Sequence, residues 1–310
     1  MNAPKDSDYI PYREKPEWKD IVPVPQDDGP HPLAPIAYSY KYTDTLDTFR
    51  AICMAEEISE RALTLTQTVI ELSPAHYTVW LYRQRLLIEL KVDLSDELDF
   101  LDELAENNPE CYQLWQHRQF VVDRLNSADR EKEFFLEIME EDSKNFHAWT
   151  FRQWLINRFD LWEAELPFVD ELLDEDVRNN SAWNQRFYIL TNNPHAPLTE
   201  EAIQKEVEFS TSKISVIAFN ECPWNYIKGL YIRFYGKDAY KPKLLTVAHS
   251  LKEQGIKSRH LLAWFVDIYS SPGLGDVAHG IEACKNLISA DFVRSKYWTY
   301  QLEKLQKLVQ

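Results

Sequence analysis

Tryptophan and the residues around it recur along the chain with a period of about 34 residues. The spacings from Trp80 to Trp115, Trp149 and Trp183 are 35, 34 and 34 residues, and Trp224 follows after 41. One frame surrounds each of the first four, in the segments SPAHYTVWLYR, NPECYQLWQHR, DSKNFHAWTFR and DVRNNSAWNQR. Self-similarity at this period predicts a solenoid of helical hairpins.

The frame predicts one helix of each hairpin. Residues that favour N-caps stand seven positions before each tryptophan: Ser73, Asn108, Asp142 and Asp176. Pro74 and Pro109 follow two of them, at what we predict to be the first helical position, where a missing N–H costs nothing. An arginine stands three positions after each tryptophan: Arg83, Arg118, Arg152 and Arg186. We expect these arginines to join hairpin to hairpin, and we expect His117, which lies in the same frame, to be structural too.

The other helix of each hairpin has an apolar stripe. Large apolar residues stand fifteen and eleven positions before the tryptophans: Leu65 and Val69, Phe100 and Leu104, Phe134 and Ile138, Phe168 and Leu172. The step of four is about one helical turn, so each pair faces one buried side. Acidic residues recur nine positions before the tryptophans, at Glu71, Glu106, Glu140 and Asp174. We interpret them as a solvated outer face.

The two ends of the chain depart from the repeat. Eight of the sixteen prolines lie within the first 35 residues, a density that predicts an extended, polyproline-like arm. Its apolar residues, Trp18 among them, favour partial packing. We assign residues 1–47 to this arm and 48–310 to the hairpin repeats, clear over 60–192 and degenerate over 199–310. Thr199 is a predicted cap, and later helices are expected near 240–254, 259–270, 276–288 and 292–309. The predicted fold class is all-α: a right-handed superhelical solenoid of about seven hairpins.

Composition and charge exclude several classes of protein. Seven glycines argue against dinucleotide-binding folds and β-barrels. The net charge of −16 argues against binding of nucleic acid or anionic membranes, which attract clustered lysine and arginine. The four cysteines are widely separated, so we predict neither a disulfide framework nor a cysteine-based zinc site. No secretory signal, membrane span or lipidation signal is evident, and we expect a cytoplasmic protein.

No catalytic motif is present. HExxH, GxGxxG, GxxxxGK[ST] and GxSxG are all absent from the sequence. From the residues alone, the favoured interpretation is an interaction scaffold with an extended face for a partner, and an enzyme is the alternative.

The repeat resembles a known family. Pro-x-x-Tyr-x-x-Trp-x-x-Arg at about 34-residue spacing is similar to the repeat of protein prenyltransferase α subunits. The arm, EWKDIVPVPQDDGPHPLAPIAYS, resembles the segment before the repeats in the α subunit shared by protein farnesyltransferase and protein geranylgeranyltransferase type I. The segments RAICMAEEISERALTLTQTVIEL, KNFHAWTFRQWLI and LPFVDELLDEDVRNNSAWNQRFYIL are similar as well. The resemblance covers roughly residues 17–235. The VPVPQDDGP arm argues against the alternative of a Rab geranylgeranyltransferase α subunit.

The resemblance implies that the chain is one subunit of a heterodimeric enzyme. In this family the α subunit wraps around a β subunit. The β subunit holds the catalytic Zn²⁺, with Mg²⁺ as a further candidate ion, and most of the isoprenoid pocket. The complex transfers farnesyl or geranylgeranyl from its diphosphate to the cysteine thiol of a C-terminal CaaX motif, as found on small GTPases. The resemblance therefore implies that this chain binds no metal or cofactor itself and works as a heterodimer.

The resemblance also implies roles for individual residues. Tyr77 and Gln113 match positions on the side of the CaaX peptide, where the Gln113 amide would hydrogen-bond the terminal carboxylate. Tyr112 and His147 match positions near the isoprenoid diphosphate, where both side chains can donate to a charged leaving group. Two positions depart from the family: Glu110 stands where a lysine is typical, and Phe146 where a tyrosine is usual. We expect a basic side chain elsewhere, on the β subunit, to replace the lysine.

Overall fold

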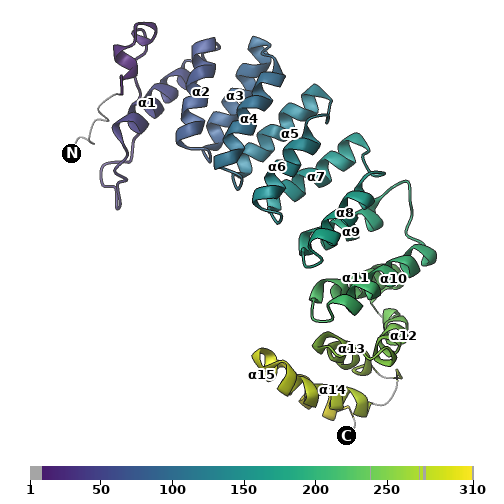
Figure 1. Ribbon diagram of the computed structural model, residues 1–310. Helices are drawn as coiled ribbons and strands as arrows, with labels where there is room; N and C mark the ends of the chain where they lie inside the picture. Colours follow the sequence, from purple (N-terminus) through teal and green to yellow (C-terminus); the bar gives the residue numbers. More distant parts are fainter. Residues whose placement is uncertain (1–8, 238, 272, 275–276, 309–310) are drawn as a thin grey trace. The chain divides into compact units, whose positions relative to one another are not determined.

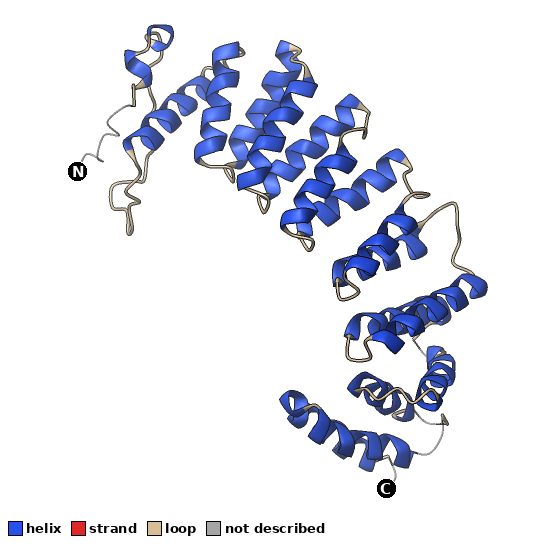
Figure 2. Cartoon of the chain, viewed as in Figure 1, coloured by secondary structure: helices blue, strands red, loops and turns tan. Residues whose placement is uncertain are grey.

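The computed structural model describes residues 9–237, 239–271, 273–274 and 277–308. Over these residues the chain forms fifteen α-helices and three short 3-10 helices, joined by loops, and contains no strand (Figure 2). The chain divides into two compact units, one ending at Phe159 and the other beginning at Asp160. In the described ranges no helix has the length and apolar character needed to cross a membrane.

In its described residues, the first unit holds seven α-helices, labelled in Figure 1. They are α1 (Tyr40–Met54), α2 (Glu60–Leu72), α3 (Tyr77–Leu90), α4 (Leu94–Asn107), α5 (Tyr112–Leu125), α6 (Glu131–Glu141) and α7 (Phe146–Phe159). Two 3-10 helices, η1 (Tyr12–Glu14) and η2 (Pro16–Trp18), precede them. Because α1 begins at Tyr40, the last eight residues of the predicted arm, 40–47, are helical rather than extended.

The second unit holds the other eight α-helices of the described chain. They are α8 (Glu165–Glu175), α9 (Asn180–Asn192), α10 (Glu200–Val216), α11 (Glu221–Tyr235), α12 (Tyr240–Glu253), α13 (Arg259–Tyr269), α14 (Val277–Ala290) and α15 (Ser295–Gln306). The 3-10 helix η3 (Phe292–Arg294) precedes α15. Thr199 caps α10 as predicted, since its side chain accepts a hydrogen bond from the Ala202 N–H.

From α2 onward the described helices form seven consecutive hairpins, α2/α3 to α14/α15, after the single helix α1. Within each unit the second helices of successive hairpins pack together, as α3 does with α5, α5 with α7, and α9 with α11. The expected array of about seven hairpins is therefore present.

The repeated tryptophan closes the turn inside each of five hairpins. Its indole Nε1 donates to the backbone carbonyl six residues earlier, at 2.7–3.1 Å: Trp80 to Pro74, Trp115 to Pro109, Trp149 to Ser143, Trp183 to Val177 and Trp224 to Ala218. All five indoles are buried. A buried tryptophan needs an acceptor for its N–H, and the carbonyl of the turn supplies one. The tryptophan thus combines core packing with a hydrogen bond that no aliphatic residue can make.

The predicted start of the second helices is wrong by about three residues. Ser73, Asn108, Asp142 and Asp176 cap the C-terminal ends of α2, α4, α6 and α8 instead. Each opens a turn in which its carbonyl accepts the N–H three residues on, as His76 N bonds Ser73 O at 3.0 Å. Ser or Asn followed by Pro suits the first two positions of a type I turn as well as a helix start. The first helix runs up to this residue. The chain must therefore reverse its direction here before the second helix can begin, and the turn makes that reversal.

Buried arginine–glutamate pairs join one hairpin to the next. The guanidinium of Arg83 bonds Glu97, that of Arg118 bonds Glu131 and that of Arg186 bonds Glu206, each through two N–H groups at 2.6–3.0 Å. Each pair connects the second helix of one hairpin to the first helix of the next. Bidentate geometry makes these the strong kind of ion pair. The structural role predicted for these three arginines is confirmed.

The apolar stripe of the first helices faces the core as predicted. Six of its eight members are buried, while Phe100 and Leu172 are half-buried. Phe100 and Phe134 lie beneath guanidinium groups, with ring centroids 4.6 Å from Arg83 and 3.4 Å from Arg118. The acidic residues on the opposite side, Glu71, Glu106, Glu140 and Asp174, are all exposed. The first helices therefore bury one side and carry charge on the other.

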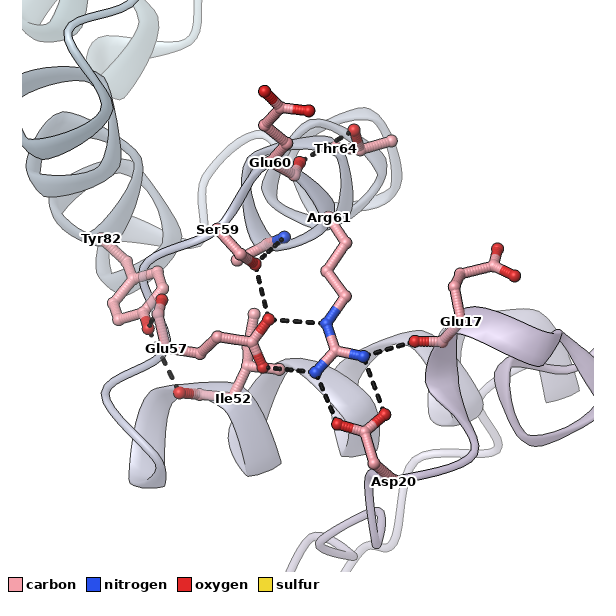
Figure 3. Close-up of polar contacts among 10 residues, drawn as sticks. Glu17, Asp20, Ile52, Glu57, Ser59, Glu60, Arg61, Thr64 and Tyr82 are labelled. Atoms are coloured by element: carbon pink, nitrogen blue, oxygen red, sulfur yellow. Dashed lines mark hydrogen bonds and ion pairs between the residues drawn. The ribbon is translucent and has the colours of Figure 1, made fainter.

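Part of the proline-rich arm packs against α1 and α2. Tyr12 and Trp18 are buried, and the Tyr12 N–H bonds the Asp44 carboxylate at 2.9 Å. Arg61, on α2, reaches the arm through two hydrogen bonds to Asp20, both 2.8 Å, and one to the Glu17 carbonyl (Figure 3). Arg61 also bonds the carboxylate of Glu57, which lies just before α2. The hydrogen bonds from Arg61 lower the pKa of Asp20 to about 2.

Arg61→Ala is expected to release residues 16–21 from α2 while leaving the hairpins intact. The variant removes the contacts to Asp20 and Glu17 and the cation that lies 5.0 Å from the Trp18 ring centroid. Hydrogen–deuterium exchange is expected to speed up several-fold at the Trp18 and Ile21 amides, because local opening of the arm becomes easier. Arg85→Ala is the matched control, because Arg85 makes one exposed 3.5 Å pair with Glu56. Equal exchange in both variants would show that aromatic burial alone holds the arm.

Candidate functional site

A groove of about 590 Å³ lies along the second helices of the first unit. Tyr77 and Gln84 of α3, Tyr112 and Gln113 of α5, and Trp154 of α7 contribute to its lining. The structure thus brings together three of the four site residues predicted from the sequence, although Tyr77 and Tyr112 are 35 positions apart. The repeat explains this, because Tyr77 and Tyr112 are the first residues of α3 and α5.

Tyr77 and Tyr112 are exposed, unlike the buried aromatic residues of the same helices. The exposed fractions of Tyr77 and Tyr112 are 70% and 57%. Residues in the first helical turn next to them, Trp80 and Trp115, are buried, so the repeat places one aromatic inside and one outside. Phe146, at the same repeat position in α7, is exposed as well. An exposed aromatic row of this kind indicates a binding surface.

Gln113 has a free hydrogen-bond donor in the groove. Its Oε1 accepts a weak bond from the Cys111 Sγ at 3.6 Å. Among the residues that the structure describes, its amide nitrogen has no hydrogen-bond partner. An amide N–H in a groove that Tyr77 and Tyr112 also line can bind a carboxylate or a carbonyl of an extended ligand.

His147 lies beside Tyr112 but outside the residues that line the groove. The two ring centroids are 6.1 Å apart in an edge-to-face arrangement. The His147 Nε2 lies 3.9 Å from a carboxylate oxygen of Glu110. Tyr112 therefore faces the groove on one side and His147 on the other, and the imidazole and phenol can donate to one anionic group.

Asn145 is part of this arrangement, and the sequence interpretation missed it. Its Nδ2 donates to Glu110 Oε1 at 2.9 Å and to the Pro109 carbonyl at 3.2 Å, while its Oδ1 accepts the Ala148 N–H at 2.9 Å. It ties the start of α7 to the turn before α5. A signal was available, because asparagine also stands four positions before Trp183 and Trp224, at Asn179 and Asn220.

In the described part of the chain, no group of three His, Cys, Asp or Glu side chains is placed to hold a metal ion. The groove and the Tyr112–His147 pair offer hydrogen-bond donors beside exposed aromatic surface. Such an arrangement suits recognition and orientation of an anionic, partly apolar ligand.

Known proteins resemble the chain along most of its length. A family model described as "Protein prenyltransferase alpha subunit repeat" matches residues 59–90, 94–125, 128–159 and 162–193. The protein farnesyltransferase/geranylgeranyltransferase type-1 subunit alpha of Dictyostelium discoideum is 38% identical over 97% of this chain and 96% of that relative. The chain belongs to this family of prenyltransferase alpha subunits. It is therefore a subunit of a transferase, as the resemblance implied.

A solved structure supports the same assignment. The Candida albicans protein geranylgeranyltransferase-I complexed with GGPP contains a chain that aligns with a TM-score of 0.82 and 32% identity, over 97% of this chain and 100% of that one. This agreement confirms the predicted fold class. A type-2 alpha subunit from D. discoideum is 30% identical but matches only 24% of this chain. The chain is therefore more similar to the type-1 alpha subunits than to this type-2 alpha subunit.

His117, at the back of the groove of this alpha subunit, is buried as predicted for a structural residue. Its Nε2 lies 2.8 Å from Glu97 Oε1, and its ring centroid 4.9 Å from that of Trp80. Burial lowers the pKa of His117 although Glu97 opposes the shift. Burial lowers the pKa of His76 and His260 in the same way. The unfolded chain therefore binds these protons more readily, and stability falls as the pH drops below about 6.5.

His117→Gln is expected to reduce this loss of stability. Glutamine keeps a donor for Glu97 but cannot titrate, so the thermal midpoint of the variant should fall less than that of the wild type between about pH 7.5 and pH 5.5. Each unit by which the pKa is lowered corresponds to roughly 1.4 kcal/mol once the pH is well below both values. His195→Gln, at an exposed histidine paired with Asp160, should retain the wild-type fall. The opposite ranking of the two variants would contradict the argument.

Proposed function

We propose that the chain is the alpha subunit of a heterodimeric CaaX prenyltransferase. The enzyme moves a farnesyl or geranylgeranyl group from its diphosphate to the cysteine of a C-terminal CaaX motif. The bond between C1 of the isoprenoid and the diphosphate oxygen breaks, a C1–sulfur bond forms, and diphosphate and the thiol proton leave. Family membership and the groove with its free Gln113 donor support this proposal.

On the peptide side, the Gln113 amide donates to the terminal carboxylate and Tyr77 packs against the peptide. The observation that carries this assignment is that the Gln113 Nε2 faces no acceptor among the described residues of the chain. A hydrogen bond to a charged group is worth about 1.5–3 kcal/mol. Recognition of the peptide end therefore depends strongly on this one amide.

On the isoprenoid side, Tyr112 and His147 donate to the diphosphate as charge builds on the leaving oxygen. Glu110 lies next to them and opposes that charge, so a basic side chain of the beta subunit compensates for it. The Zn²⁺ of the complex, held by the beta subunit, favours the thiolate form of the acceptor cysteine. This chain contributes binding and orientation to the reaction rather than a metal.

Reconstitution tests the proposed function. The chain is co-expressed with a beta subunit of farnesyltransferase or of geranylgeranyltransferase type I, and the purified complex is mixed with labelled farnesyl or geranylgeranyl diphosphate and a CaaX peptide. Label transferred to the peptide, and absent when the cysteine is replaced by serine, is the expected result. A stable complex that transfers neither group would leave only a scaffold function.

Glu110→Lys is expected to leave the single-turnover rate of the complex within about twofold of the wild type, because the compensating base on the partner already stabilises the diphosphate. Glu110→Gln is the control, since it removes the charge but keeps an oxygen acceptor for Asn145. Rapid-quench measurement of one turnover gives the rates. A several-fold rise for the lysine variant alone would mean that the site lacks a charge and that the partner supplies no substitute.

A further inference from the structure

A pocket of about 600 Å³ lies in the second unit, and the proposed reaction does not use it. It lies where the end of α12, the turn 255–258, α13 and α14 come together, helices that are labelled in Figure 1. Its volume is within the usual range for small-molecule sites. Its lining shares no residue with that of the groove in the first unit.

The pocket is elongated, and its two ends can be assigned from contacts between α13 and α14. At the end of α13, Tyr269 stacks on His279 of α14, with ring centroids 5.5 Å apart. At the start of α13, the Arg259 Nη1 lies 3.9 Å from Asp291, which follows α14. The two helices therefore run in opposite directions. The lining extends along α13 from Arg259 to Tyr269, a helical rise of about 15 Å, which suits an extended ligand better than a compact one.

The body of the pocket is apolar. Leu262, Phe265 and Tyr269 contribute to the lining at helical spacing and therefore lie on one side of α13, with Leu261 beside them. The Phe265 and Tyr269 rings are stacked, with centroids 5.9 Å apart. Ala283 of α14 lines the same body. A hydrocarbon chain placed here would exchange water for aromatic and aliphatic contacts.

The other end of the pocket is positively charged. Lys252 in the last turn of α12, Lys257 in the turn and Arg259 at the start of α13 all contribute to its lining. Among the residues that the structure describes, neither lysine has an ion-pair partner. Glu282, the single carboxylate of the lining, lies one turn from His279 and therefore toward the opposite end. In a chain with a net charge of −16, this local concentration of cations is complementary to an anion.

Arg259 has an unused hydrogen-bond donor at the charged end. Its Nε is buried and has no partner within the described ranges. The nearby carboxylate of Asp291 already accepts hydrogen bonds from Arg294 Nε at 2.7 Å and Trp298 Nε1 at 2.8 Å, both at Oδ2. A buried N–H without an acceptor is costly and rare. An anionic group bound at this end of the pocket would supply the acceptor.

We propose that this pocket binds a small amphiphilic anion, with one carboxylate or phosphate head group on a hydrocarbon tail. The head group pairs with Lys252, Lys257 and Arg259, where the N-terminal end of α13 adds partial positive charge. The tail lies along α13, past Phe265 toward Tyr269. The site is built by this chain alone, so the inference goes beyond the proposed function and does not depend on it.

Fluorescence titration of the full-length chain with a dansylated long-chain carboxylate tests the site. Dodecanoate, dodecyl phosphate and dodecyltrimethylammonium are the competitors, each used below its micellar concentration. Lys252→Glu/Lys257→Glu reverses the charge of the head-group end, and Asn286→Trp fills the pocket from an exposed position of its lining. Lys237→Glu/Lys304→Glu is the matched control, because both lysines are exposed in the same unit and neither lines the pocket. Circular dichroism checks the fold of each variant.

The wild type is expected to bind one dye per chain, and dodecanoate or dodecyl phosphate should displace it. The stronger of the two competitors identifies the head group. Each pocket variant should raise the dissociation constant by about tenfold or more, through lost ion pairs or lost space, while the control stays within about twofold. Octanoate should compete at least about tenfold more weakly than dodecanoate, because fewer methylene groups are buried.

Wild-type affinity in both pocket variants, or equal displacement by dodecanoate and dodecyltrimethylammonium, would overturn the site. The titration is repeated with the co-expressed heterodimer, in which the part of the signal that Lys252→Glu/Lys257→Glu removes should persist. Loss of that part would mean that a polypeptide covers the pocket, and would overturn the proposal of a small ligand. A heterodimer that binds the dye in this way but transfers no isoprenoid would contradict only the proposed function.

Discussion

Arg118→Ala is expected to lower the free energy of unfolding by about 3–5 kcal/mol. Arg118 has no exposed surface, and its partner Glu131 is 2% exposed. Burial raises the pKa of Glu131, and the Arg118 guanidinium opposes that shift. Removing the guanidinium leaves a buried carboxylate without its bidentate partner and also frees Asp102, which Arg118 Nη1 contacts at 2.6 Å. Urea unfolding followed by circular dichroism measures the change.

Arg130→Ala is the matched control, since Arg130 also bonds Asp102, at 2.7 Å, but its side chain is 44% exposed. A loss below about 1 kcal/mol is expected there. If Arg118→Ala does not fold, Arg118→Leu/Glu131→Leu keeps the argument testable, because replacing both charges with apolar groups should restore most of the stability. Equal losses for Arg118→Ala and Arg130→Ala, or no recovery in the double variant, would contradict a cost due to the unpaired carboxylate.

Gln113→Ala is expected to lower kcat/KM of the reconstituted enzyme for a CaaX peptide by roughly 10- to 100-fold, the equivalent of one hydrogen bond to a charged group. The proposed bond joins the Gln113 amide to the terminal carboxylate. The loss should appear mainly in KM, because the bond exists before and during transfer. Steady-state kinetics with a dansylated peptide measure it.

A peptide with an amidated C-terminus separates this bond from a general disturbance of the groove. The wild type should prefer the free carboxylate, and Gln113→Ala should lose most of that preference. Gln116→Ala, in which the lost amide was already paired with Gln119, should keep it. If Gln113→Ala lowers kcat/KM equally for both peptides, the amide has a packing role and does not bind the carboxylate.

Much of the fold was predictable because the same residue types recur at fixed positions in each repeat. The tryptophan period determined the hairpins, and the arginine three positions after each tryptophan indicated the bonds between hairpins. The predicted starts of the second helices were wrong, because Ser73-Pro74 and Asn108-Pro109 suit a turn and an N-cap equally. Only the end of the preceding helix decides between them, and that end depends on packing.

The candidate site was less predictable. The repeat explains why Tyr77 and Tyr112 share a groove, since both begin a second helix. The role proposed for Gln113 came from the family resemblance, because no local pattern distinguishes it from Gln116. Asn145 and its bond to Glu110 were missed, since the two residues are 35 positions apart and the pair forms only when adjacent hairpins stack.

The sequence by itself determined the all-helical class, the hairpin period, the buried side of the helices in the clear repeats, and the family. These properties follow from local spacing, which a helix converts directly into a face. Only the tertiary structure decided what lies between hairpins: which carboxylate each arginine binds, where His147 lies relative to Tyr112, and the bond from Asn145 to Glu110. Such contacts join residues of different hairpins, from 13 to 35 positions apart, and their geometry depends on how one hairpin packs on the next.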